Sequence, residues 1–166
     1  MNILKTVEEL ASLLNSQGWK VALAESCTGG LVSATLTELA GSSNWFDRGY
    51  ITYSNQAKTE CLGVPSELIE SHGAVSEPVA KAMAEGAQRH ARVTAAISIT
   101  GIAGPSGGSI EKPVGTVCFG WAIQYQDTVR TTCKTKLFTG DRQAVRQQAT
   151  LFALVELSTL LKSTYP

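Results

Sequence analysis

The sequence predicts a three-layer α/β/α domain with a mixed, partly parallel sheet. Helical patterns alternate with short apolar strand patterns from residue 6 to residue 100, which is typical of parallel strands joined by helices. Two long strand patterns then follow each other directly over 115–138, as in an antiparallel hairpin. The length of 166 residues, with no internal shift in composition, fits a single domain over 1–166.

The first predicted elements are a helix and a buried strand. Apolar residues recur at i, i+3, i+4 and i+7 over 7–14, which predicts an amphipathic helix. Thr6 and Glu9 form a capping-box pattern at its start, and Gly18 is a stop signal. The apolar run 20–24 (KVALA) then predicts a short buried strand.

A strand, turn and helix arrangement comes next and is repeated once. The segment 25–30 (ESCTGG) joins the first strand to a predicted helix over 31–39. A second strand is predicted over 48–53. Ser54 then caps a short helix, which ends at Gly63.

The middle of the chain predicts a longer helix and a third strand. Ser76 is a suitable N-cap with Pro78 at an early helical position, and the helix is expected to run to about His90. The strand 93–100 (VTAAISIT) leads into the glycine-rich segment 101–108, which apolar strand patterns flank on both sides.

The last elements are two strands, predicted over 115–124 and 128–138, and a closing helix that begins after Asp141. Charged and apolar residues alternate in 128–138, which predicts an antiparallel edge strand with one solvated face. The predicted buried side of the closing helix is formed by Val145, Ala149, Phe152 and Val155, and it is widened by Leu151, Leu154 and Leu157.

Composition excludes several classes of function. Fourteen acidic residues balance fourteen basic ones without a charged block, so a nucleic-acid partner is not expected. The four cysteines lack CxxC spacing and there are only two histidines, which argues against a zinc site. Neither a phosphate-binding GxxxxGK[ST] nor a dinucleotide-binding GxGxxG motif occurs, so no cofactor is expected. With no signal peptide or membrane span expected, we predict a cytoplasmic protein with reduced thiols.

Three polar segments, 26–30, 54–58 and 101–108, each follow a predicted strand. If the three strands are parallel and adjacent, these segments meet in the crevice beyond the carboxyl ends of the strands. Ser26 at the start of a helix can combine a nucleophile with an oxyanion hole formed by backbone N–H groups. The simpler interpretation is that it only caps the helix.

A serine nucleophile needs a base, and Lys58 is the best-placed candidate. An exposed lysine has a pKa near 10.4, so this role requires burial that lowers the pKa by about two to three units. Otherwise Lys58 is a solvated surface residue. The Tyr53 hydroxyl can hydrogen-bond Ser26 or Lys58, and Cys27 is an alternative nucleophile. Arg142 and Arg146, one helical turn apart, can clamp a phosphate together, although arginines on a helix face are more commonly solvated.

Five separated motifs resemble the C-terminal domain of the CinA competence-damage-inducible family, in its stand-alone nicotinamide-mononucleotide deamidase form. The resemblance extends over nearly the whole chain. The motifs are AESCTGG at 24–30, TYSN at 52–55 with Lys58, GAVSE at 73–77, TGIAGP at 100–105 and KPVGTV at 112–117.

The resemblance implies hydrolysis of the carboxamide of nicotinamide mononucleotide to nicotinate mononucleotide and ammonia. The nucleophile of the family falls on Ser26, and its assisting tyrosine and lysine fall on Tyr53 and Lys58. A homo-oligomer such as a dimer is expected. The additional N-terminal domain of longer members is not expected in this sequence. We expect the backbone and side chains of seven residues to contact the substrate: Thr28, Gly29 and Gly30 at the oxyanion, and Gly101, Ala103, Gly104 and Arg142 at the phosphate.

Two alternatives to this enzyme remain. A relative can keep the fold as a catalytically silent nucleotide-binding module. A competence factor associated with DNA is suggested only by the name of the family, and the balanced charge disfavours direct DNA binding.

Overall fold

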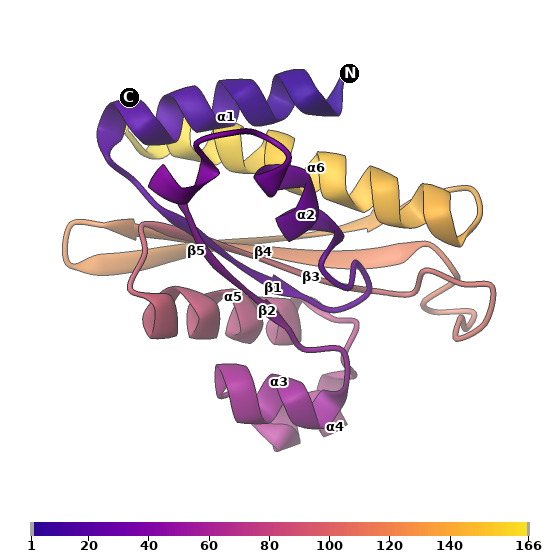
Figure 1. Ribbon diagram of the computed structural model, residues 1–166. Coiled ribbons are helices and arrows are strands. Elements are labelled where there is room, and N and C mark those ends of the chain that lie inside the picture. Colours follow the sequence, from indigo (N-terminus) through magenta and orange to yellow (C-terminus); the bar gives the residue numbers. More distant parts are fainter. Residues whose placement is uncertain (1, 166) are drawn as a thin grey trace.

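A five-stranded mixed sheet forms the centre of the protein, and the computed structural model describes residues 2–165 (Figure 1). The strands are β1 (Val21–Glu25), β2 (Phe46–Ile51), β3 (Ala95–Gly101), β4 (Thr116–Tyr125) and β5 (Thr128–Leu137). Their order is β2-β1-β3-β4-β5, with β1 parallel to β2 and β3, and β4 antiparallel to β3 and β5. The predicted mixed sheet is confirmed.

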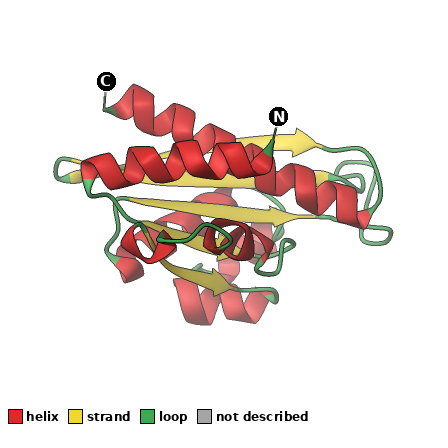
Figure 2. Ribbon diagram, turned by 45° about the horizontal axis from the view of Figure 1, so that its top comes forward, coloured by secondary structure: helices red, strands yellow, loops and turns green. Residues whose placement is uncertain are grey.

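Helices cover both faces of this sheet, which gives the three predicted layers (Figures 1 and 2). On one face lie α1 (Ile3–Gln17), α2 (Leu31–Thr37) and α6 (Arg142–Thr164), and a short 3-10 helix spans Ser42–Asn44. On the other face lie α3 (Asn55–Leu62), α4 (Ser66–His72) and α5 (Glu77–Ala91). Within residues 2–165, no helix has the length and apolar character needed to cross a membrane.

The connections of β1 create the crevice in which a ligand can bind. From β1 the chain passes through α2 to β2 on one side, and later through α3, α4 and α5 to β3 on the other side. The strand order therefore reverses at β1, and in open α/β sheets such a switch point is where ligands bind.

Each face of the sheet has its own core. Under α1 and α6 the core is aromatic, with the ring of Phe119 on β4 centred 4.9 Å from that of Phe152 on α6. Under α5 it is formed by smaller residues, and α3 approaches α5 closely. A Cβ atom at Gly86 would lie 2.1 Å from the carbonyl oxygen of Leu62, so only glycine permits this approach. The contact fixes α3, which carries Lys58, against α5.

Several helix ends agree with the sequence, but the start of α1 does not. Ser54, Ser76 and Asp141 accept hydrogen bonds from backbone N–H groups of α3, α5 and α6, as their N-cap positions predict. The predicted capping box at Thr6 is wrong. Asn2 is the N-cap of α1, and the Thr6 hydroxyl donates to the Asn2 carbonyl from inside the helix.

Two further expectations, on the far side of the molecule, hold in part. β5 is the predicted antiparallel edge strand, with Arg130 and Lys136 exposed on its charged face, but the middle of the strand is half-buried. Thr131 donates to Glu85 on α5, while Lys134 pairs with Glu156 on α6. The closing helix buries Val145 and Ala149 as predicted, but Phe152 and Val155 are only half-buried.

Candidate active site

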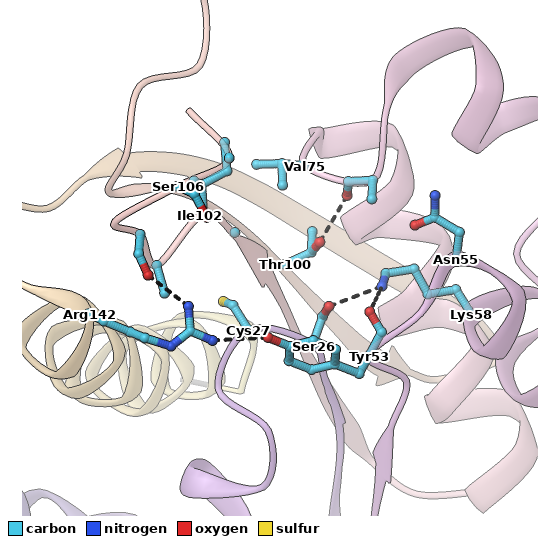
Figure 3. Close-up of a pocket in the computed structure, with 15 residues that line it drawn as sticks. Ser26, Cys27, Tyr53, Asn55, Lys58, Val75, Thr100, Ile102, Ser106 and Arg142 are labelled. Atoms are coloured by element: carbon cyan, nitrogen blue, oxygen red, sulfur yellow. Dashed lines mark hydrogen bonds between the residues drawn. The ribbon is translucent and has the colours of Figure 1, made fainter. Parts of the chain in front are cut away.

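A polar cavity of about 320 Å³ opens where β1, β2 and β3 end. The condition on which the sequence argument depended is met, because these three strands are parallel neighbours. Each of the three polar segments, 26–30, 54–58 and 101–108, supplies residues to the lining of this cavity (Figure 3). Fifteen residues line the cavity: Ser26, Cys27, Tyr53, Asn55, Lys58, Ala74, Val75, Thr100, Gly101, Ile102, Ala103, Gly104, Ser106, Gly107 and Arg142.

Ser26 and Lys58 meet inside this cavity. Ser26 is the first residue after β1, and its N–H donates to the Ile99 carbonyl of β3, which holds the backbone in line with the sheet. Lys58 lies one turn inside α3, and its Nζ is 3.0 Å from Ser26 Oγ. A proton can be exchanged directly at this distance.

The Lys58 side chain is buried rather than solvated. Its exposed fraction is 1%, and its Nζ also donates to the backbone carbonyls of Thr52, at 2.9 Å, and Tyr53, at 3.3 Å. Burial lowers the pKa of Lys58 below its ordinary value of 10.5. Nζ donates to Ser26 Oγ in this arrangement; once neutral, the amine can keep two N–H groups on the carbonyls and accept the Ser26 proton on its lone pair.

Glu25 holds the helix that follows the nucleophile, a role that the sequence argument missed. Its fully buried carboxylate accepts from the backbone N–H groups of Gly30, Val32 and Ser33 and from the Ser33 hydroxyl, at 2.7 to 3.2 Å. A negative charge is stabilised at a helix N-terminus, where these N–H groups have no partner within the helix. The carboxylate therefore fixes the start of α2 relative to the end of β1.

This arrangement changes the expected oxyanion hole. The Gly30 N–H donates to Glu25 and the Gly29 N–H to the Ser26 carbonyl, so neither is available to a substrate. Gly29, Gly30 and the fully buried Thr28 side chain do not line the cavity. In the part of the chain that the structure describes, the loop N–H groups that donate to no other residue are those of Cys27 and Thr28.

Cys27 is poorly suited to be the nucleophile. Its exposed fraction is 6%, and burial raises the pKa of its thiol to about 12, although its own backbone N–H and Arg146 act in the opposite direction. A thiol with this pKa is almost entirely protonated at neutral pH, whereas the thiolate is the reactive form. The helix N-terminus beside it does not offset the burial.

The other wall of the cavity brings Tyr53, Gly104 and Arg142 together. The Arg142 guanidinium donates to the Gly104 carbonyl at 2.8 Å and to the Tyr53 hydroxyl at 3.0 Å (Figure 3). The expected hydrogen bond from the Tyr53 hydroxyl to Ser26 or Lys58 is therefore absent, and Tyr53 reaches Lys58 through its backbone carbonyl alone. The Tyr53 residue is 60% exposed, at the mouth of the cavity.

Arg146 does not join Arg142 at the cavity. Its guanidinium donates to the carbonyl oxygens of Cys27, at 3.2 Å, and Thr28, at 2.9 Å, and thus ties α6 to the nucleophile loop. The expected phosphate-binding residues Gly101, Ala103, Gly104 and Arg142 all line the cavity.

Several cavity residues were not singled out from the sequence. Asn55 lies one turn before Lys58 on α3, and its carboxamide points toward the cavity in Figure 3. Thr100 donates to the Ala74 carbonyl and closes the floor beside Ser26. Asn55 lies in the TYSN motif and Thr100 in the TGIAGP motif, so the resemblance to the family was the signal that could have identified them. Within residues 2–165, no three His, Cys, Asp or Glu side chains are grouped to hold a metal ion.

Comparison with known proteins gives the family. The family model described as the CinA C-terminal domain matches residues 4–161. The chain is 50% identical over 155 residues to a protein of Escherichia coli strain K12 named nicotinamide-nucleotide amidohydrolase PncC, covering 93% of this chain and 92% of that one. It is 56% identical over 148 residues to a CinA-like protein of Syntrophobacter fumaroxidans, of whose length it spans 34%.

Solved structures agree with this assignment. A competence damage-inducible protein A from Klebsiella pneumoniae superposes with a TM-score of 0.92 at 36% identity, over 98% of each chain. A competence/damage-inducible protein from Agrobacterium tumefaciens gives a TM-score of 0.89 at 40% identity, over 96% of this chain and 95% of that one. The chain is thus an α/β protein with the fold of these CinA-superfamily structures. It belongs to the CinA C-terminal domain family.

Proposed function

We propose that this protein is an amidohydrolase that converts nicotinamide mononucleotide to nicotinate mononucleotide and ammonia, with Ser26 as nucleophile and Lys58 as base. One observation carries the proposal: a lysine with an exposed fraction of 1% lies 3.0 Å from the serine hydroxyl. The relatives named nicotinamide-nucleotide amidohydrolase, at about half sequence identity, support the choice of substrate.

In the first half of the proposed cycle, Ser26 is acylated. Neutral Lys58 takes the hydroxyl proton while Ser26 Oγ forms a bond to the carboxamide carbon. The N–H group of Cys27, which lines the cavity, stabilises the oxyanion that forms. Lys58 then returns its proton to the amide nitrogen, the C–N bond breaks, and ammonia leaves.

In the second half, water replaces ammonia. Lys58, neutral again, takes a proton from water while the water oxygen attacks the acyl carbon. The Cys27 N–H holds the second oxyanion as well, and the bond to Ser26 Oγ breaks as Lys58 returns the proton to Ser26. Nicotinate mononucleotide is released and the amine is neutral at the start of the next cycle.

The rest of the substrate occupies the wall opposite Lys58. We assign the phosphate to Arg142 and to the backbone of 101–108, where a guanidinium and unpartnered N–H groups suit an anion. Arg142 now donates to Tyr53 and Gly104, and both acceptors are neutral, so a phosphate can replace them. Tyr53 is thereby assigned to substrate entry rather than to proton transfer.

An ammonia-release assay on nicotinamide mononucleotide tests the proposed function. Wild type should release one ammonia for each nicotinate mononucleotide formed, with or without a chelator, whereas Ser26→Ala should be inactive. Tight binding of the mononucleotide without ammonia release would instead indicate a catalytically silent binding module.

The phosphate assignment has its own test. Arg142→Ala should raise KM for the mononucleotide by at least about tenfold while leaving KM for the phosphate-free nucleoside unchanged, as expected for loss of a charge-assisted contact. An equal effect on both substrates would reject the assignment. A cytoplasmic location and a homo-oligomer stay predictions, and light scattering would measure the oligomeric state.

A further inference from the structure

The nucleophile loop 26–30 is held from two sides. On one side Glu25 accepts from the N–H groups at the start of α2. On the other side Arg146 donates to two successive carbonyl oxygens, with Nε to Cys27 and a terminal nitrogen to Thr28. An arginine that binds two backbone carbonyls with two different nitrogens fixes their relative orientation, which a single donor cannot do.

These contacts determine where the loop N–H groups point. In a trans peptide the C=O and the following N–H point in opposite directions. Holding the Cys27 carbonyl toward Arg146 therefore turns the Thr28 N–H away from α6. Cys27 lines the cavity, whereas Thr28 and Arg146 do not, so the Cys27 N–H is the loop donor nearest to a bound substrate.

The second carbonyl contact acts on the neighbouring peptide. Arg146 orients the Thr28 carbonyl, and the Gly29 N–H of the same peptide donates to the Ser26 carbonyl at 3.0 Å. That bond in turn sets the plane of the peptide that carries the Cys27 N–H. Both N–H groups that donate to no other residue in the described loop thus have orientations that depend on one guanidinium.

We infer that Arg146 is a positioning residue that forms the oxyanion hole by aiming the Cys27 N–H at the reacting carbonyl, through the chain of contacts from the Thr28 carbonyl to the Ser26 carbonyl. This inference rests on the proposed amidohydrolase function. Arg146 touches no substrate atom; it acts through the loop. Its loss should therefore lower kcat with little change in KM, because the oxyanion exists only after attack.

Steady-state kinetics of Arg146→Met and Arg146→Lys test the inference. Loss of an oxyanion-hole donor typically lowers kcat by about 10²-fold or more, and this is expected for Arg146→Met with KM changed less than about threefold. Arg146→Lys keeps the positive charge but cannot donate to both carbonyls from two fixed nitrogens, so its kcat should lie between those of Arg146→Met and wild type. Arg130→Lys, on the edge strand β5, is the matched control and should match wild type.

A thioamide substrate separates an oxyanion role from a general structural one. Sulfur accepts hydrogen bonds weakly, so backbone N–H donors favour the oxygen amide. The ratio of kcat/KM for nicotinamide mononucleotide to that for its thioamide analogue should fall in both variants. An unchanged kcat, a loss confined to KM, or a lower kcat with an unchanged ratio would each overturn the inference.

A measurement on wild type keeps the inference testable if both variants unfold. When pyridine-3-carbaldehyde adds to Ser26, the amide proton resonance of Cys27 should move downfield in nitrogen-edited NMR spectra. Movement at Gly29 and Gly30 instead would overturn it. Wild type without ammonia release would overturn the proposed function and this inference together, whereas active wild type with unaffected variants would overturn only the role of Arg146.

Discussion

The sharpest prediction concerns the energetic coupling of Ser26 and Lys58. Lys58→Met removes the amine and keeps an unbranched side chain of similar length in the buried site. The distance of 3.0 Å between Nζ and Oγ makes Lys58 the direct proton acceptor, so kcat/KM should fall by about 10² to 10⁴, the usual contribution of a general base. This corresponds to about 3 to 5 kcal/mol of transition-state stabilisation.

The double variant Ser26→Ala, Lys58→Met decides whether the two residues act as one unit. If they do, it should be no less active than the worse single variant, because neither group functions without the other. The assay is ammonia release under kcat/KM conditions, with Lys81→Met on the exposed side of α5 as a control for removing a lysine. Losses that multiply in the double variant, or a Lys58→Met variant that keeps a tenth of wild-type activity, would refute the reasoning.

Lys58→Met should also lower the free energy of unfolding. The carbonyl of Thr52, a residue with 0% exposure, accepts from Lys58 Nζ. Removing that donor costs about 1 to 3 kcal/mol, less whatever is regained by no longer burying an amine. Urea unfolding would measure the difference, and correction for it separates loss of the base from loss of the fold.

The remaining predictions concern charge and burial around the same loop. Because burial lowers the pKa of Lys58 below 10.5, the folded state loses this proton at a pH where the unfolded state keeps it, so stability should rise with pH between the two values. For the same reason kcat/KM should rise through the lowered pKa and level off before pH 10.5, and a profile still rising beyond pH 10.5 would contradict the assigned base. Cys27→Ala should keep the wild-type kcat. Iodoacetamide should modify Cys27 in the folded protein far more slowly than it modifies a free thiol, since burial raises the pKa of Cys27 to about 12. Rapid modification with loss of activity would argue for Cys27 as the nucleophile. Glu25→Gln places an amide N–H group against backbone N–H donors and should lower the free energy of unfolding in urea by about 2 to 4 kcal/mol. An unchanged urea midpoint would show that the carboxylate does not hold α2.

Much of the fold could be predicted because its signals are local. A left-handed glycine ends α1 at Gly18 and α3 at Gly63, and each is recognisable from a few residues of sequence. The helix α4 was missed because its seven residues follow Pro65 and end before Gly73, in a stretch that resembles a loop. A short element of this kind is stabilised by tertiary packing, with Ile69 buried against α5, and that is not visible in a local pattern.

The site was predictable in type but not in its connections. Polar residues after apolar strands indicated Ser26 and Lys58, yet their meeting depends on β1 lying between β2 and β3, which no local pattern specifies. The hydrogen bond from Arg142 to Tyr53 joins residues 89 positions apart. Glu25 was hidden for a different reason: its partners are backbone N–H groups, which every sequence possesses.

The position of β2 at the margin of the sheet has a consequence for how the protein would lose activity. This strand pairs with β1 alone, and the chain leaves it for α3, so the amine is held by an edge strand on one side and by the contact of α3 with α5 on the other. Joint loosening of β2 and α3 would carry the proton acceptor away from the alcohol while the antiparallel half stays intact. Inactivation is therefore expected to precede melting.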